Sequence, residues 1–124
     1  MCKVKDMMTK RVVTIPDDLG IQQISNILVQ NSLSGVPVMD NEHKLIGFVS
    51  ERDIVAAVAS GGFLEKKAKD IMCKDITTVS EDTTLEQVTK IFAEKPFRHL
   101  PVVNKGEVIG IISRRDVFGK LLES

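Results

Sequence analysis

Two short segments carry the side chains of this sequence that are best suited to binding chemistry. Ser50-x-x-Asp53 and Ser113-x-x-Asp116 each follow a run of β-branched and aliphatic residues and precede a hydrophobic pattern at helical spacing, so each lies where a strand runs into a helix. A carboxylate at such a junction can accept hydrogen bonds from the vicinal hydroxyls of a ribose, and the free amides of a helix N-terminus attract phosphate. The same pattern also describes a capping box, in which both side chains only satisfy backbone amides.

Two basic residues stand near the second junction. Arg98 and His99 come directly before a Leu-Pro-Val strand, at the edge of the sheet where the second junction is expected. Arginine can clamp a phosphate with its planar fork and histidine can add a donor, although both side chains could simply solvate a strand end. The first copy has Ser34 and Gly35 at this place, small and uncharged. We therefore expect any anion site to be unequal between the two copies.

The remaining composition argues against several classes of protein. Two histidines, His43 and His99, and two isolated cysteines, Cys2 and Cys73, cannot supply the roughly four convergent ligands of a metal site. No nucleophile and base pair and no Walker-type glycine loop is present, so we predict a non-enzyme without catalytic residues, metal or required cofactor.

Charge and hydropathy limit the partners in the same way. Lysine plus arginine equals aspartate plus glutamate at 17 each, and the five aromatic residues are all phenylalanine, which argues against nucleic acid as a partner. No apolar run has the length of a signal peptide or a transmembrane helix, which argues against a membrane partner. The sequence predicts a soluble cytoplasmic protein.

The chain is one unit used twice. An offset of 64 positions aligns residues 5–39 with residues 69–103, and after the loss of one residue in the first hairpin turn an offset of 63 aligns the remainder. The identical pairs before that turn are Lys5/Lys69, Asp6/Asp70, Met8/Met72, Lys10/Lys74, Thr14/Thr78, Asp18/Asp82, Gln23/Gln87, Ile27/Ile91, Pro37/Pro101 and Val38/Val102. We interpret this as a tandem duplication, joined at the flexible stretch Ser60-Gly61-Gly62.

Each copy predicts the order helical turn, strand, helix, strand, strand, helix. The ranges are turns at 5–8 and 69–72, strands at 12–15 and 76–79 closed by turn residues at 16–18 and 80–82, helices around Ile21 to Leu28 and Leu85 to Phe92, strands at 36–39 and 100–103 with proline at their start, return strands at 45–50 and 108–113, and helices at 54–59 and 117–122. The mid-strand residues Gly47 and Gly110 predict a close approach of backbone or ligand. The fold class is therefore α/β (α+β), with one sheet face of each unit left to be covered by the other copy.

This ordered and repeated set of segments resembles a tandem of CBS domains, the regulatory module named after cystathionine β-synthase. The resemblance covers essentially the whole chain and implies a first repeat at 1–60, a linker at 61–67 and a second repeat at 68–124, packed with pseudo-twofold symmetry as one Bateman module. It implies a non-catalytic sensor of energy state or metabolites that binds AMP, ADP, ATP or S-adenosylmethionine, with AMP expected first. It also implies a homodimer that acts on a separate effector protein, which the sequence does not identify.

The resemblance further implies two clefts and assigns residues to each. The first cleft would use Asp116 for the ribose, Ser113, Arg98 and His99 for the phosphate, and Thr14, Ile15 and Pro16 for the base, with Ser34 nearby. The second would use Asp53 and Ser50 with Thr78, Val79 and Ser80. The alternative is a structural or interaction protein with vestigial clefts, because every motif residue also has a capping or packing role.

Overall fold

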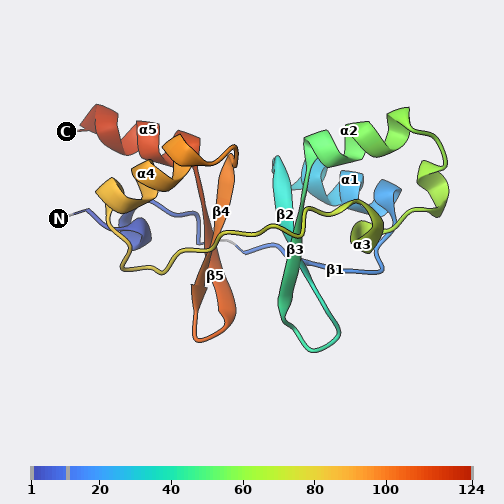
Figure 1. Cartoon of the computed structure of the whole chain (residues 1–124), viewed down its shortest axis with the longest axis horizontal. Coiled ribbons are helices and arrows are strands. Elements are labelled where there is room, and N and C mark those ends of the chain that lie inside the picture. Colours follow the sequence, from blue (N-terminus) through green and yellow to red (C-terminus); the bar gives the residue numbers. More distant parts are fainter. Residues whose placement is uncertain (1, 11, 124) are drawn as a thin grey trace. The chain divides into compact units, whose positions relative to one another are not determined.

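The computed structural model describes residues 2–10 and 12–123 (Figure 1). Its elements are η1 (Val4–Asp6), β1 (Ile15–Pro16), α1 (Ile21–Gln30), β2 (Gly35–Met39), β3 (Leu45–Ser50), α2 (Glu51–Ala59), η2 (Phe63–Glu65), α3 (Ala68–Ile71), α4 (Leu85–Glu94), β4 (His99–Asn104), β5 (Glu107–Ser113) and α5 (Arg114–Glu123). This order confirms the predicted mixed α and β fold. The strands predicted at 12–15 and 76–79 are shorter than expected, because the first is reduced to β1 and the second to a single bridge at Val79.

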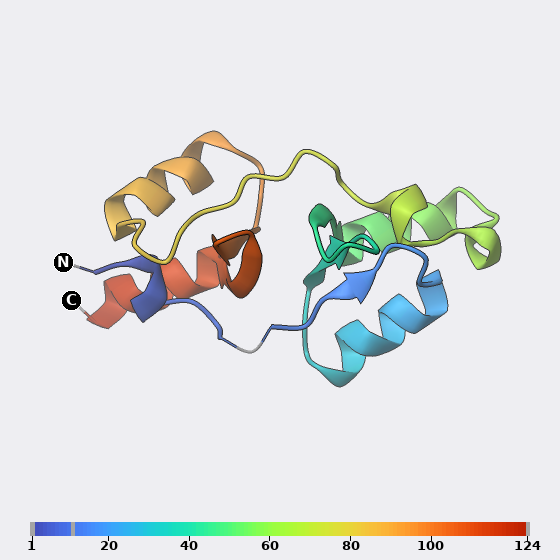
Figure 2. The same cartoon turned by 90° about the horizontal axis from the view of Figure 1, so that it is seen from below.

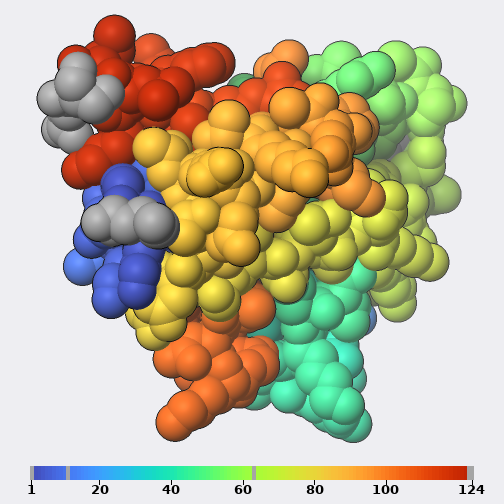
Figure 3. Space-filling view, turned by 60° about the vertical axis from the view of Figure 1, so that its left-hand side comes forward, coloured from blue at the N-terminus to red at the C-terminus, as the bar shows by residue number. Residues whose placement is uncertain are grey.

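The chain packs into two units whose boundaries differ from those of the sequence repeats. One unit, the contiguous unit, comprises Val13–Ile76, and the other, the split unit, comprises Met1–Val12 and Thr77–Ser124. Figures 1 and 2 show the blue η1 beside the C-terminal helices. In Figure 3 the blue N-terminal residues lie against the gold residues that lead into α4. The segment before the first repeat's strands therefore completes the fold of the second repeat.

The sheet of the contiguous unit has the order β1, β2, β3. Ile15 pairs with Val38 in parallel, and β2 and β3 form an antiparallel hairpin in which Gly35 is opposite Ser50. On the far side of β3, Phe48 and Cys73 exchange backbone hydrogen bonds of 3.0 and 2.9 Å. The residues after α3 thus extend this sheet at its β3 edge.

The split unit repeats this arrangement at equivalent positions. Val79 bridges Val102 in parallel, and β4 and β5 form an antiparallel hairpin. Thr9 and Ile111 exchange backbone hydrogen bonds of 2.9 and 3.1 Å at the β5 edge. Both sheets therefore receive their edge segment from the stretch that precedes the other repeat in the sequence.

The prolines lie inside their strands, and the prediction that they begin them was wrong. Pro37 and Pro101 are the third residues of β2 and β4. In the split unit, the Val79 amide donates to the Pro101 carbonyl at 3.1 Å and the Val103 amide donates to the Val79 carbonyl at 2.9 Å. The first β4 amide that bonds to Val79 is that of Val103, which follows Pro101. The missing N–H of Pro101 therefore costs this ladder no hydrogen bond.

The starts of α1 and α4 agree with the sequence prediction, but the cap of α4 was not predicted. Residues 17–18 and 81–82 form turns, and the two helices begin at Ile21 and Leu85. Thr84 caps α4 by accepting the Gln87 amide at 3.1 Å, while the Gln87 side chain accepts the Thr84 amide at 3.0 Å. This capping box was missed because the turn residues before it carry similar polar side chains.

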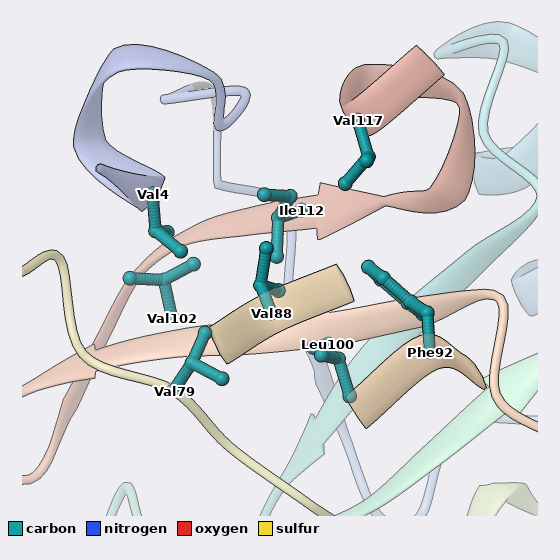
Figure 4. Packing of buried hydrophobic residues seen from close by; sticks show 8 residues of the cluster. All are labelled: Val4, Val79, Val88, Phe92, Leu100, Val102, Ile112 and Val117. Atoms are coloured by element: carbon teal, nitrogen blue, oxygen red, sulfur yellow. The ribbon is translucent and has the colours of Figure 1, made fainter. Parts of the chain in front are cut away.

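Each unit has its own hydrophobic core between the sheet and its helix pair. The core of the split unit (Figure 4) consists of Val4, Val79, Val88, Phe92, Leu100, Val102, Ile112 and Val117. The core of the contiguous unit consists of Ile15, Ile24, Leu28, Val36, Val38, Val49 and Ala68. The helices therefore cover one face of each sheet, and the opposite face carries Ser50 or Ser113.

The mid-strand glycines admit the close approach that the sequence predicts. A Cβ atom on Gly47 would lie 2.3 Å from the sulfur of Met72, and one on Gly110 would lie 2.7 Å from the sulfur of Met8 and 2.9 Å from the Thr9 carbonyl. The approaching groups belong to the exchanged edge segments. The glycines are therefore required for docking of those segments.

Candidate functional site

The first junction is a capping box, as one of the two sequence interpretations predicts. Ser50 ends β3 and Asp53 lies in the first turn of α2. The Ser50 amide donates to Asp53 Oδ2 at 2.8 Å, the Asp53 amide donates to Ser50 Oγ at 3.2 Å, and Ser50 Oγ lies 3.0 Å from the same carboxylate oxygen. The cap thus uses the same two side chains that the sequence predicts for the ligand site.

The second junction has the same geometry. Ser113 ends β5 and Asp116 lies in the first turn of α5. The Ser113 amide donates to Asp116 Oδ2 at 2.8 Å, and the Asp116 amide donates to Ser113 Oγ at 3.1 Å. The duplicated motif therefore forms the same two reciprocal amide bonds in both units.

The cap uses only half of each carboxylate. The recorded bonds of Asp53 and Asp116 to the described residues all reach Oδ2, and none reaches Oδ1. Both side chains are half-buried. A carboxylate oxygen has two lone pairs, so Oδ1 of each aspartate keeps the capacity to accept from hydroxyl donors such as those of a ribose.

Strand register places the predicted basic residues at the second junction. His99, the first residue of β4, is directly opposite Ser113, and the Arg114 amide donates to the Arg98 carbonyl at 3.1 Å. His99 is half-buried and Arg98 is exposed. The structure thus brings Asp116, Ser113, Arg98 and His99 together at one strand end of the split unit.

The equivalent place in the contiguous unit is built from smaller residues. Gly35 is directly opposite Ser50, and the Glu51 amide donates to the Ser34 carbonyl at 3.0 Å. A Cβ atom on Gly35 would lie 2.4 Å from Cε1 and 2.9 Å from Cζ of Phe48. The Phe48 ring therefore occupies the position that a side chain at residue 35 would take.

Sequence reasoning missed the part that Phe48 plays at this junction. The available signal is that Gly35 and Phe48 in one repeat correspond to His99 and Ile111 in the other. The small glycine and the large phenylalanine of one repeat are replaced by two side chains of intermediate size in the other. This compensation is visible only once the repeats are aligned in register.

The residues assigned to the base lie on the first-strand segments. Ile15 is 1% exposed and Val79 is 6% exposed, and both side chains belong to the cores of their own units. A ligand could therefore meet only their backbone atoms. Thr14 and Pro16 are exposed, as are Thr78 and Ser80. Each predicted cleft combines such a segment with the junction of the other unit, and this combination stays a prediction.

A separate groove of about 420 Å³ lies between α4 and α5 of the split unit. Its lining consists of Thr89, Phe92, Ala93, Arg114, Val117, Phe118 and Leu121. The Nη2 atom of Arg114 donates to the Lys95 carbonyl at 3.3 Å, while its buried Nε has no hydrogen-bond partner among the described residues. Neither Ser113 nor Asp116 lines this groove, so its chemistry is separate from that of the junction.

Two further tests concern other classes of site. Within residues 2–10 and 12–123, no three histidine, cysteine, aspartate or glutamate side chains gather as a metal ion would need. None of the helices in the same residues is long and apolar enough to cross a membrane.

Comparison with known proteins identifies the repeated unit. The family model described as CBS domain matches residues 4–60 and residues 68–123. The chain is 34% identical over 116 residues to inosine-5'-monophosphate dehydrogenase of Methanocaldococcus jannaschii, a match that covers 93% of this chain and 23% of that enzyme. The chain therefore spans about a quarter of the length of that relative.

Two solved structures show the same fold with adenosyl ligands bound. CBSX2 of Arabidopsis thaliana in complex with AMP is 29% identical, with a TM-score of 0.85, over 99% of this chain and 98% of that one. The CBS domain pair of protein MJ0100, in complex with 5'-methylthioadenosine and S-adenosyl-L-methionine, is 26% identical, with a TM-score of 0.87, over 99% and 97% of the two chains.

Proposed function

Because this chain belongs to the CBS-domain family as a tandem pair, we propose that it is a non-catalytic regulatory module that senses energy state or metabolites by binding adenosyl ligands, with AMP as the first candidate. The two similar structures with AMP and with 5'-methylthioadenosine and S-adenosylmethionine support the ligand class. The enzyme relative is matched over only a quarter of its length, so its activity is not transferred to this chain.

The observation that carries the proposal is the half-used carboxylate at each junction. Asp53 and Asp116 are oriented by their own helix caps through Oδ2, and Oδ1 takes no hydrogen bond from the described residues. A pre-oriented carboxylate loses little side-chain entropy when it binds the two hydroxyls of a ribose. The serine and the positive end of the helix dipole stand beside it, and both favour a phosphate.

We assign the phosphorylated ligand to the junction of the split unit. Asp116 would bind the ribose, and Ser113, Arg98 and His99 would bind the phosphate. In the predicted cleft the base would meet Thr14, Pro16 and the backbone of Ile15, with Ser34 nearby. The second cleft would use Asp53 and Ser50 together with Thr78, Ser80 and the backbone of Val79.

Isothermal titration calorimetry of protein stripped of carried-over ligand tests this proposal. AMP, ATP, 5'-methylthioadenosine and S-adenosylmethionine are titrated into the wild type and Asp116→Asn. Asparagine keeps an oxygen for the cap but loses the charge, and hydrogen bonds to charged groups contribute about 1.5–3 kcal/mol. We therefore expect AMP to bind about 10- to 100-fold more weakly.

The matched control is an exposed aspartate far along the chain from either junction. Asp75→Asn should leave AMP binding unchanged, because Asp75 is exposed and lies outside both assigned sites. Equal AMP affinity in Asp116→Asn and the wild type would refute the site. No heat with any of the four compounds would favour the alternative, an interaction module with vestigial clefts.

We further propose that the module is a homodimer joined through its helices. α2 and α5 expose large apolar side chains, and Val55 and Val58 of α2 correspond in the repeat to Phe118 and Leu121 of α5. Phe118 is 62% exposed and lies at the groove between α4 and α5. Apolar surface repeated at equivalent positions suits an interface between identical copies.

Light scattering coupled to gel filtration tests the dimer. Phe118→Glu should convert it to a monomer, whereas Lys105→Glu in the β4–β5 turn should not. A monomeric wild type at micromolar concentration would contradict this part of the proposal. The cytoplasmic location and a separate effector protein are likewise proposed, and the effector would be sought by its ligand-dependent binding to the dimer.

A further inference from the structure

We infer that the two junctions bind different adenosyl ligands: the split-unit junction takes a phosphorylated nucleotide, and the contiguous-unit junction takes an adenosyl thioether without phosphate, selected by Phe48. This inference rests on the proposed function. It adds a ligand class for the second site and a specificity-determining residue that the duplicated motif does not contain.

The two junctions are comparable position by position. Gly35 is opposite Ser50 just as His99 is opposite Ser113, and the serine and aspartate caps agree within 0.1 Å in the bonds that both share. Val36 and Val49 point into the core. Because side chains alternate along a strand, residues 35, 48 and 50 share the opposite face. Phe48 therefore lies on the same face as Ser50.

The two junctions differ in the charge of their equivalent residues. Arg98, Arg114 and Arg115 of the split unit correspond to Ser34, Glu51 and Arg52 of the contiguous unit, so these positions carry a formal charge of +3 in the first and zero in the second. The Arg114 guanidinium donates to the backbone carbonyl of Lys95, so it is not directed at the junction, but its charge still contributes to the positive electrostatic potential there. A phosphate is attracted to the first site, while Glu51 opposes it at the second.

The Phe48 ring replaces the missing donors with an apolar surface. It covers the position over Gly35 that His99 fills in the other unit, and Phe48 is half-buried. An aromatic ring binds a thioether sulfur and its methyl group favourably, with the sulfur about 5 Å from the ring. A phosphate placed against the same ring would lose hydration on that side and gain no donor from the ring. The ligand that fits Asp53 beside this ring is an adenosyl group whose 5' substituent is uncharged.

A reciprocal exchange of the two residue pairs tests the inference. Gly35→His alone would collide with the Phe48 ring, so the contiguous unit is converted by Gly35→His with Phe48→Ile. The reverse variant carries His99→Gly with Ile111→Phe. Calorimetry with AMP and with 5'-methylthioadenosine gives the stoichiometry, and Asp53→Asn and Asp116→Asn assign each binding event to a junction.

In the wild type we expect one tight AMP equivalent, lost in Asp116→Asn, and one methylthioadenosine equivalent, lost in Asp53→Asn. Gly35→His with Phe48→Ile should strengthen AMP binding at the contiguous unit at least 10-fold and weaken methylthioadenosine binding by a similar factor. Phe48→Ile alone introduces no bulk, so it provides the test if the double variant does not fold. It should weaken only methylthioadenosine binding.

The outcomes separate this inference from the proposed function. Two AMP equivalents of equal affinity in the wild type, or a Phe48→Ile variant with unchanged methylthioadenosine binding, would overturn the inference and leave the proposed function intact. Absence of binding of every adenosyl compound to the folded wild type would overturn both.

Discussion

Val4→Ala tests the assignment of the N-terminal segment to the core of the second repeat. Val4 is 0% exposed and packs in the cluster that contains Leu100 and Ile112, and its amide donates to the Thr83 carbonyl at 2.8 Å. The substitution removes two methylene equivalents, at about 0.8 kcal/mol each. With the cavity that is left, we expect a loss of about 2 kcal/mol in the free energy of unfolding.

The loss of stability should be confined to the split unit. Such a change raises the unfolded fraction about 30-fold, which denaturant titration measures directly. Hydrogen exchange read by mass spectrometry should show faster exchange in α4, β4 and β5, while α1 and β2 stay protected as in the wild type. Val29→Ala is the control, because Val29 is 78% exposed on α1 and its truncation should change stability by less than about 0.5 kcal/mol.

Two results would refute the reasoning. One is a change below about 0.5 kcal/mol, which would mean that Val4 is not part of a packed core. The other is faster exchange confined to residues 13–76, which would place the N-terminal segment in the unit of its own repeat. The second result would also contradict the hydrogen bonds between Thr9 and Ile111.

Three further predictions concern positions outside the candidate sites. Gly47→Ala should cost about 1–3 kcal/mol because its Cβ would meet the Met72 sulfur, and adding Met72→Ala should recover part of this loss in denaturant titrations. Thr84→Ala should lower the free energy of unfolding by about 1 kcal/mol through loss of the α4 cap, whereas Thr84→Ser should retain stability. Equal denaturation midpoints for Thr84→Ala and the wild type would exclude a stabilising cap. A hydrogen bond from the Lys3 amide lowers the pKa of Asp6 from its usual 3.8, so the stability that Asp6 contributes is present above that pH and is lost as the pH falls through the lowered pKa. The advantage of the wild type over Asp6→Asn should therefore disappear in acid titrations below pH 3.8, and a constant difference would contradict it.

The order of elements was predictable from the sequence because its signals are local. The apolar spacing of Ile21, Ile24 and Leu28 specifies a helix face, and these residues are buried. The starts of α2 and α5 were placed three residues too late, because Glu51 and Arg114 are polar and carry no periodic signal. Apolar spacing thus locates the buried part of a helix better than its solvated first turn.

The exchange of the edge segments could not be predicted in the same way. Residues 5–8 and 69–72 resemble each other, so either segment would suit either core. At the sites, the serine and aspartate pairs were predicted because they lie three residues apart in one turn. The contact of Phe48 with Gly35 was not, since it joins residues on different strands and depends on the register of the hairpin.

The split unit also affects how the protein acquires its structure during synthesis. Residues 13–76 form their unit from one uninterrupted stretch, so this half can fold as soon as it leaves the ribosome. The N-terminal segment is made first but bonds to Thr83 and Ile111, which are made much later. Until then Val4 and Met8 lack their core, and both apolar side chains stay exposed to solvent until the last part of the chain is made.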